Sequence, residues 1–184
     1  MKKVKVVYRM LIVMGIAVAL LGIGCSTFQR APVTKAVAVL RSHPDFRISG
    51  TITFIQEGMN VRVIVDASGL APGKHGIHIH EFGDLSSPDF TSAGGHFNPG
   101  NKAHAAPYDM ERHVGDLGNI EADKSGRVKD NFLDEKIALT GSNSIIGRSV
   151  IIKEKADDFT TQPGGGAGKR IAAGIIGISP LPGD

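Results

Sequence analysis

Eight short runs of β-branched or alternating residues, separated by turn signals, constrain the fold of this chain more than any other feature of its sequence. A sustained apolar pattern with a period of about 3.6 residues is absent, so long amphipathic helices are not expected. The composition agrees, because 24 glycines and 9 prolines stand against 5% aromatic residues. We therefore predict an all-β, antiparallel sandwich or barrel with strands near residues 36–40, 48–56, 60–67, 76–81, 116–122, 126–134, 148–154 and 171–178.

Two of the connections between these strands are much longer than the usual length of roughly four to six residues. They span residues 82–115 and 155–170, and the second contains the run Gly164-Gly165-Gly166. Long loops on a β scaffold usually carry function. Candidate functional residues are therefore expected in these two loops.

The N-terminus has the layout of a secretory signal peptide. Residues 1–9 are basic and are followed by the apolar run 10–23, which ends at Gly24-Cys25. A membrane-spanning helix needs about 20 apolar residues, so this run is short for a permanent transmembrane anchor, which stays open as the alternative. We expect the signal at residues 1–25, a polar tether at 26–34 and one domain at 35–184.

Cys25 is the single cysteine of the chain and directly follows the small residue Gly24 at the end of the apolar run. This arrangement resembles a bacterial lipoprotein processing site, although Gly22 stands where such sites usually carry leucine. We expect Cys25 to carry a lipid that anchors the protein outside the cytoplasm, with a soluble secreted or periplasmic form as the alternative. A lone cysteine also excludes an intrachain disulfide.

The net charge of +3 does not indicate a nucleic-acid partner. Lys2, Lys3, Lys5 and Arg9 supply four of the positive charges within the signal segment. The remaining sequence has no Lys/Arg-rich run with interleaved aromatic residues, which is the usual electrostatic footprint of nucleic-acid binding. We therefore expect no nucleic-acid partner.

Six of the seven histidines lie between His75 and His113, and Asp116 follows closely. On a strand over 76–81 the side chains alternate, so His78 and His80 share one face while the intervening isoleucines face the interior. Two imidazoles on one face can bind one metal ion. His43 stands alone, and we expect it to be an ordinary structural histidine.

The remaining members of the cluster are three imidazoles and one carboxylate in or just after the first long loop: His96, His104, His113 and Asp116. This donor set suits a closed, tetrahedral, structural Zn²⁺ site. Solvated loop histidines, or buried histidines bonded to the backbone, are the alternative for any one of them alone. Clustering of so many ligand-type residues favours a metal site.

Several segments of the chain resemble the copper/zinc superoxide dismutase family. The stretch 73–84, GKHGIHIHEFGD, is similar to the copper-ligand strand of that family, and SAGGHFNP and RHVGDLGN at 92–99 and 112–119 are similar to its zinc loop. The resemblance continues through the motifs at 144–148, 154–158, 170–172 and 174–178. It covers the whole domain from about Lys35.

This resemblance implies an eight-stranded Greek-key β-barrel that converts superoxide to oxygen and hydrogen peroxide. It implies copper bound by His78, His80 and His96, and zinc bound by His96, His104, His113 and Asp116. It further implies that Asp157 ties a copper-side to a zinc-side histidine, that His75 supports the strand, and that Arg170, assisted by Lys169, orients superoxide. Homodimers are common in the family, but the sequence alone indicates no contact surface.

Three positions or segments depart from the family pattern. Lys153 occupies the place of the fourth copper histidine, and no histidine follows His113. A protonated lysine has no lone pair, so we expect weak copper binding and impaired dismutation. The alternative is a non-catalytic, zinc-stabilised protein that binds copper transiently or not at all.

The other departures concern the loops. Phe90 and Ala173 stand where the family has its disulfide cysteines, and we expect the phenylalanine to pack against the alanine. The Gly-rich run 164–168 replaces a pattern that often begins with threonine in relatives. We expect this change to affect the steering of the substrate more than the fold.

Overall fold

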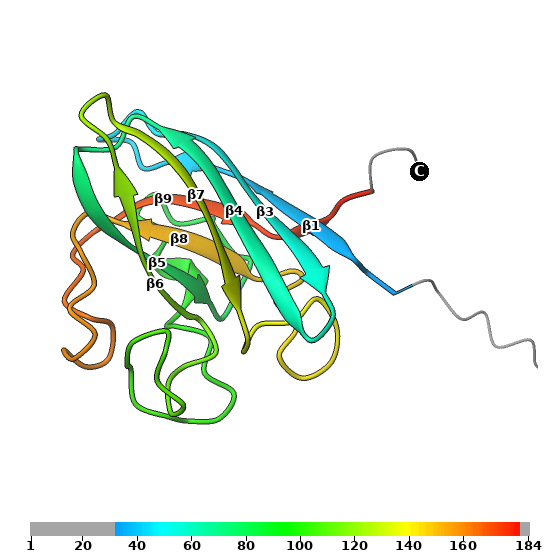
Figure 1. Ribbon diagram of the computed structural model, residues 1–184. Helices are drawn as coiled ribbons and strands as arrows, with labels where there is room; N and C mark the ends of the chain where they lie inside the picture. Colours follow the sequence, from blue (N-terminus) through cyan, green and yellow to red (C-terminus); the bar gives the residue numbers. More distant parts are fainter. Residues whose placement is uncertain (1–31, 181–184) are drawn as a thin grey trace, which may run out of the picture. The chain divides into compact units, whose positions relative to one another are not determined.

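The computed structural model describes residues 32–180, and within them each of the eight predicted runs forms a strand (Figure 1). The expected signal segment, Cys25 and residues 26–31 of the expected tether lie outside the described residues. Within residues 32–180, no helix is long and apolar enough to span a bilayer. The eight strands are β1 Lys35–Val39, β3 Ser49–Glu57, β4 Asn60–Ser68, β5 Gly73–His80, β6 Asp116–Ala122, β7 Arg127–Asp134, β8 Ser149–Lys153 and β9 Arg170–Ile175.

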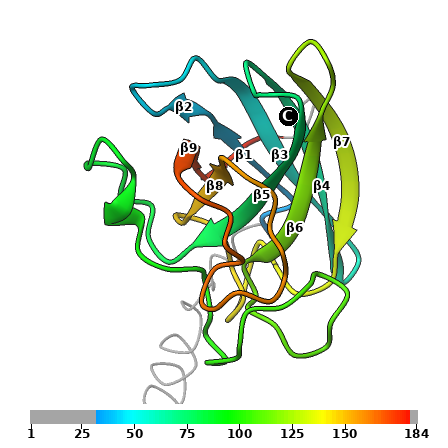
Figure 2. The same ribbon diagram turned by 90° about the vertical axis from the view of Figure 1, so that its left-hand side faces the viewer.

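Two antiparallel sheets of five strands each form the domain, which confirms the predicted fold class (Figure 2). The first sheet has the order β10-β1-β3-β4-β7, and the second has the order β2-β9-β8-β5-β6. The additional strands β2, Arg41–Ser42, and β10, Gly177–Ile178, are each two residues long. A single turn of 3₁₀ helix, η1, covers Thr91–Ala93.

The chain crosses between the two sheets twice at one edge, which the sequence did not predict. The chain passes from β1 in the first sheet to β2 in the second through Leu40, and from β9 in the second to β10 in the first through Ile176. The predicted single strand 171–178 is therefore wrong in this respect. Ile176 leaves the ladder because its side chain enters the core, while its N–H donates to the carbonyl of Arg148 at 2.9 Å.

Alternation of side chains builds the core between the sheets. Ile52 and Phe54 of β3 and Val61, Val63 and Val65 of β4 are at most 1% exposed. β-branched residues fit such half-buried pleated strands, and burial of each large side chain contributes roughly 1.5–3 kcal/mol. The core thus holds the second sheet in place as the platform for the histidines.

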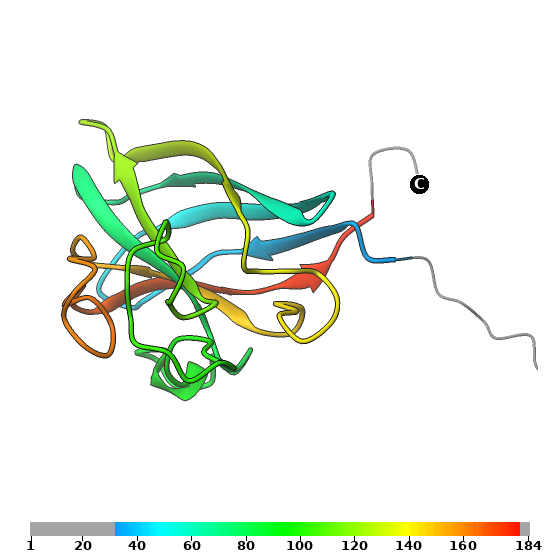
Figure 3. The same cartoon turned by 60° about the horizontal axis from the view of Figure 1, so that its bottom comes forward.

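From His75 to His80, β5 is buried on both of its faces, and its side chains alternate between the faces as the sequence predicts. Ile77 and Ile79 face the core, whereas His78 and His80 face away from it and are at most 1% exposed. Both long loops lie on this outer side, beside β5 and β6 (Figure 3). The two loops are hydrogen-bonded to each other, since the backbone N–H of His104 donates to Gln162 Oε1 at 2.8 Å. The loops therefore enclose the histidines against the sheet.

Candidate metal centre

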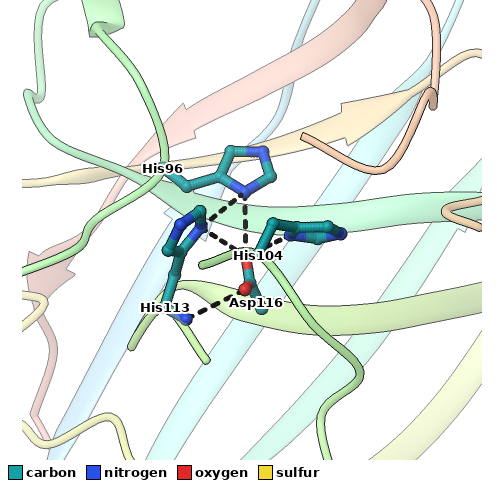
Figure 4. Close-up of side chains that lie close together, drawn as sticks. All are labelled: His96, His104, His113 and Asp116. Carbon is teal, nitrogen blue, oxygen red and sulfur yellow. Dashed lines mark hydrogen bonds and ion pairs between the residues drawn. The ribbon is translucent and has the colours of Figure 1, made fainter. Parts of the chain in front are cut away.

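Three imidazoles and one carboxylate converge at the end of the first long loop (Figure 4). Asp116, the first residue of β6, is fully buried, and its Oδ1 lies 2.8 Å from His96 Nδ1, 3.0 Å from His104 Nδ1 and 3.1 Å from His113 Nδ1. All four ligand atoms lie within 4.8 Å of one another. The sequence-predicted zinc set is thus brought together in one buried cluster.

The donor set fits a tetrahedral Zn²⁺. His104 Nδ1 is buried and has no hydrogen-bond partner despite its closeness to Asp116, so its direction suits a metal better than a hydrogen bond. Burial alone would raise the pKa of Asp116, but the surrounding imidazoles of His104, His113 and His96 hold it far below its usual range. The cluster therefore contains a permanently charged carboxylate, which a cation would neutralise.

A second set of donors lies on the other side of His96. The His78 and His96 rings stack with centroids 4.0 Å apart, and His80 lies edge-on to His96 at 5.1 Å. His78 Nδ1 and His80 Nε2 are buried without a hydrogen-bond partner. Two adjacent buried imidazole nitrogens with no partner fit a metal ion that would accept their lone pairs.

The second nitrogen of each of these rings is fixed. His78 Nε2 lies 2.7 Å from Asp157 Oδ2, and His80 Nδ1 donates to the carbonyl of Gly94 at 2.9 Å. These partners select the tautomers that leave His78 Nδ1 and His80 Nε2 free. Burial lowers the pKa of both rings, and it lowers the pKa of His96 to about 3. All three imidazoles are thus in the neutral form that can bind a metal.

Asp157 joins the two donor sets. Its carboxylate lies 2.7 Å from His78 Nε2 and 2.9 Å from His104 Nε2, so it lies between a copper-side and a zinc-side histidine of the expected sets. Its own N–H donates to Asn119 Oδ1 at 2.7 Å. Gly165 packs so closely here that a Cβ would lie 1.9 Å from Asp157 Oδ1. Sequence reasoning missed Asn119 and Gly165, because neither contact follows from spacing along the chain.

Lys153, the last residue of β8, faces a cavity of about 620 Å³ and is 8% exposed. The cavity is also lined by His80, His96, Gly164 and Arg170; we call it the Lys153 cavity. Within residues 32–180 the Lys153 ammonium has no hydrogen bond and no ion pair. Burial and repulsion from Arg170 lower the pKa of Lys153 to about 8, so it is mostly charged at neutral pH.

Two other sequence-predicted residues support this region through the backbone. Both ring nitrogens of His75 lie 2.8 Å from carbonyl oxygens, those of Lys153 and Ala71. Arg170 is half-buried and donates to the carbonyls of Phe90 and Gly94. The Gly94 carbonyl therefore accepts from both His80 and Arg170. This shared acceptor fixes the guanidinium next to the histidines.

Phe90 and Ala173 lie together in a small buried cluster apart from the main core, as the sequence predicts. The cluster also contains Ala93 and Ile151, and Leu85 packs on its edge. Phe90 adopts a left-handed backbone conformation with φ 62°, which is uncommon for a residue other than glycine. Its buried ring thus holds the loop that presents the Phe90 carbonyl to Arg170.

A two-sheet antiparallel β fold, with a buried His/Asp cluster that could hold a metal ion and a second histidine set joined to it through His96, defines the class of this protein. The chain belongs to the copper/zinc superoxide dismutase family, because residues 48–176 match the family model described as copper/zinc superoxide dismutase (SODC). A solved structure titled "Crystal Structure Analysis of the clock protein EA4" is 43% identical. The match covers 81% of this chain and 97% of that chain, with a TM-score of 0.75.

Proposed function

We propose that the protein binds structural zinc at His96, His104, His113 and Asp116. The observation that supports this is the convergence of four donor atoms on one buried point, with a charged carboxylate among them. Zinc at this point would join the first long loop to β6 and so stabilise the loop that carries the other site residues. Metal analysis of the purified protein tests the proposal.

We further propose that His78, His80 and His96 form a weak copper site. Bound copper would supply the one-electron chemistry that dismutes superoxide to oxygen and hydrogen peroxide. Arg170, fixed by two carbonyls, would bind the anion beside the site, and His96 Nε2 would face the cavity from which the anion enters. Asp157 would keep His78 in the tautomer that binds metal.

In this proposal, Lys153 is the residue that limits superoxide dismutation. It stands where the family has a fourth copper histidine, and its charged ammonium would repel copper instead of binding it. Copper would then be held by three imidazoles, of which His96 is shared with zinc. We therefore propose a superoxide dismutase of reduced activity and reduced copper affinity.

The experiment compares wild type with Lys153→His and Lys153→Leu at measured copper loading. Lys153→His should raise both copper affinity and superoxide consumption by at least about tenfold, which is the expected order for one added metal ligand or its support. Lys153→Leu removes the charge without adding a donor atom, since a thioether such as that of methionine could itself bind copper, and it separates the two effects. Wild-type turnover equal to that of Lys153→His at full copper loading would overturn the proposed impairment.

The second candidate function is a non-catalytic, zinc-stabilised protein on the same scaffold. Lys153 favours this function, because an ammonium without an ion pair, facing the cavity beside the expected copper ligands, disfavours the binding of a copper ion there. In that case wild type would retain zinc and bind copper only transiently. It would consume superoxide no faster than the same amount of free copper does. The same metal analysis and assay distinguish this candidate from the first.

We propose that the protein is exported and attached to the bacterial cell membrane through a lipid on Cys25. The basic segment, the apolar run and the Gly24-Cys25 junction support this. Cys25→Ser should remove labelling by radioactive fatty acid and shift the protein out of the membrane fraction. Unchanged fractionation of both forms, with no label on wild type, would contradict the anchor.

We propose that the protein forms a homodimer through an exposed apolar face. Val39, Phe82, Ile175 and Ile178 are 67%, 56%, 50% and 58% exposed. They lie on neighbouring segments: Gly83, next to Phe82, packs against Ile175, Gly174 packs against the Val39 carbonyl, and Ile178 lies on the strand that pairs with β1. Replacing Ile175 by aspartate should convert a dimer to a monomer in light scattering, whereas Met59→Asp, on a distant hairpin, should not.

A further inference from the structure

The Lys153 cavity contains two cations that form no ion pair with a carboxylate. Lys153 is buried and Arg170 is half-buried, and within residues 32–180 neither forms an ion pair. Glu81 is the single acidic residue among the described residues that line this cavity, and it forms no ion pair with either cation. Asp157, a buried carboxylate whose charge acts on Lys153, lies against His78 and His104.

The Lys153 side chain is largely buried and its ammonium faces the cavity, so the ammonium has lost part of its water without gaining an ion pair, which costs free energy. Arg170 adds to this cost by repulsion, and its guanidinium is held in place by the carbonyls of Phe90 and Gly94. The histidines that line the cavity cannot compensate, since they are neutral or positive, never negative. The arrangement therefore lacks a negative charge, and the cavity open to solvent is where one can enter.

Gly164 leaves space for an anion larger than superoxide. A Cβ at this position would lie 3.5 Å from His96 Nε2, so any larger side chain would extend over the part of the cavity beside that nitrogen. The cavity volume of about 620 Å³ far exceeds the size of a diatomic ion. The side chains of Asn98, Thr161 and Gln162 line it as well, and they can donate hydrogen bonds to oxygen atoms.

We propose that Lys153 and Arg170 form a binding site for a small oxyanion of the phosphate class, which operates without copper. Arg170 would give a planar pair of donors and Lys153 a compact charge from the far side. The oxyanion would neutralise the cations that the fold leaves unpaired. This inference rests on the charges of the cavity and not on the dismutation proposed above, so the two can fail separately.

The test uses the full-length chain in detergent, loaded with zinc and free of copper, with inorganic phosphate as the probe. Isothermal titration at pH 7 and constant ionic strength should show saturable binding of one phosphate. Lys153→Met should weaken it by at least about tenfold, the usual effect of losing one charge-assisted hydrogen bond. Lys155→Met is the matched control, because Lys155 is exposed and does not line the cavity, and it should change the affinity by less than about twofold.

A second variant keeps both cations and removes the space. Gly164→Thr should weaken phosphate binding by at least about tenfold through overlap with the oxyanion, and zinc content and circular dichroism should stay those of wild type. Absence of saturable phosphate binding to wild type would overturn the proposal, and so would equal binding by Lys153→Met. Should Lys153→Met fail to fold, Gly164→Thr decides, since unchanged phosphate affinity in that variant would also overturn it.

Discussion

Truncation of Phe90 to alanine should destabilise the protein by about 3–5 kcal/mol, the usual range for a fully buried phenylalanine. Phe90 is 0% exposed, and its ring lies in the separate cluster with Ala93, Ile151 and Ala173. This cluster is small, so it has few atoms that could relax into the space, which favours the upper part of the range. For a domain of this size the melting temperature should fall by about 2–4 °C per kcal/mol, or about 6–20 °C.

The assay is urea unfolding of zinc-loaded protein followed by circular dichroism, which suits a chain without tryptophan. Tyr108→Ala is the matched control, because that aromatic side chain in the same loop is 81% exposed and should contribute within about 0.5 kcal/mol. A loss below about 1 kcal/mol for Phe90→Ala at unchanged zinc content would refute the view that this packing holds the loop without a disulfide.

Three further predictions concern the zinc cluster. Gly165→Ala should lower zinc affinity, because the new Cβ would lie 1.9 Å from Asp157 Oδ1 and 2.8 Å from His104 Nε2; Gly141→Ala, with φ 78° and no atom within 4 Å, controls for backbone strain alone. Equal zinc affinity in both variants would contradict the clash. Removal of zinc by a chelator should lower the melting temperature by several degrees, since zinc binds the native state; an unchanged melting curve would argue against an occupied site. Burial alone would lower the pKa of His104, but Asp116 and Asp157 raise it to about 9, so zinc must displace its proton. Zinc affinity should therefore increase with pH up to about 9, and titrations in buffers of different ionisation enthalpy should show release of about one proton at pH 7.5; zero proton release would contradict it.

The strands and the histidine cluster could be predicted from the sequence because both depend on local patterns. Alternation along β5 places His78 and His80 on one face and Ile77 on the other whatever the rest of the chain does. The pairing of Phe90 with Ala173 was also predictable, from their places in the family pattern. Local periodicity and motif position thus gave the platform and the list of candidate ligands.

Contacts between distant segments could not be predicted in this way. Arg112 Nη2 lies 2.6 Å from Asp134 Oδ2 in a buried ion pair, and Asn119 of β6 is hydrogen-bonded to the backbone of Asp157 in the second long loop. These pairs depend on how loops fold back onto the sheet, which no residue spacing encodes. The crossing from one sheet to the other at Ile176 could not be predicted for the same reason, because packing of this side chain in the core interrupts a run that reads as one continuous strand.

The contact between His75 and residue 153 has a consequence for how this protein family can change. His75 Nδ1 meets only the backbone carbonyl of Lys153, and that carbonyl is present whichever side chain stands at the position. The strand at this point is therefore supported by main-chain atoms, while the side chain faces the cavity. A single substitution at position 153 can therefore replace a metal ligand by a residue of different chemistry while the fold stays intact. The reverse substitution can restore the ligand in the same way, and neither step requires an unfolded protein.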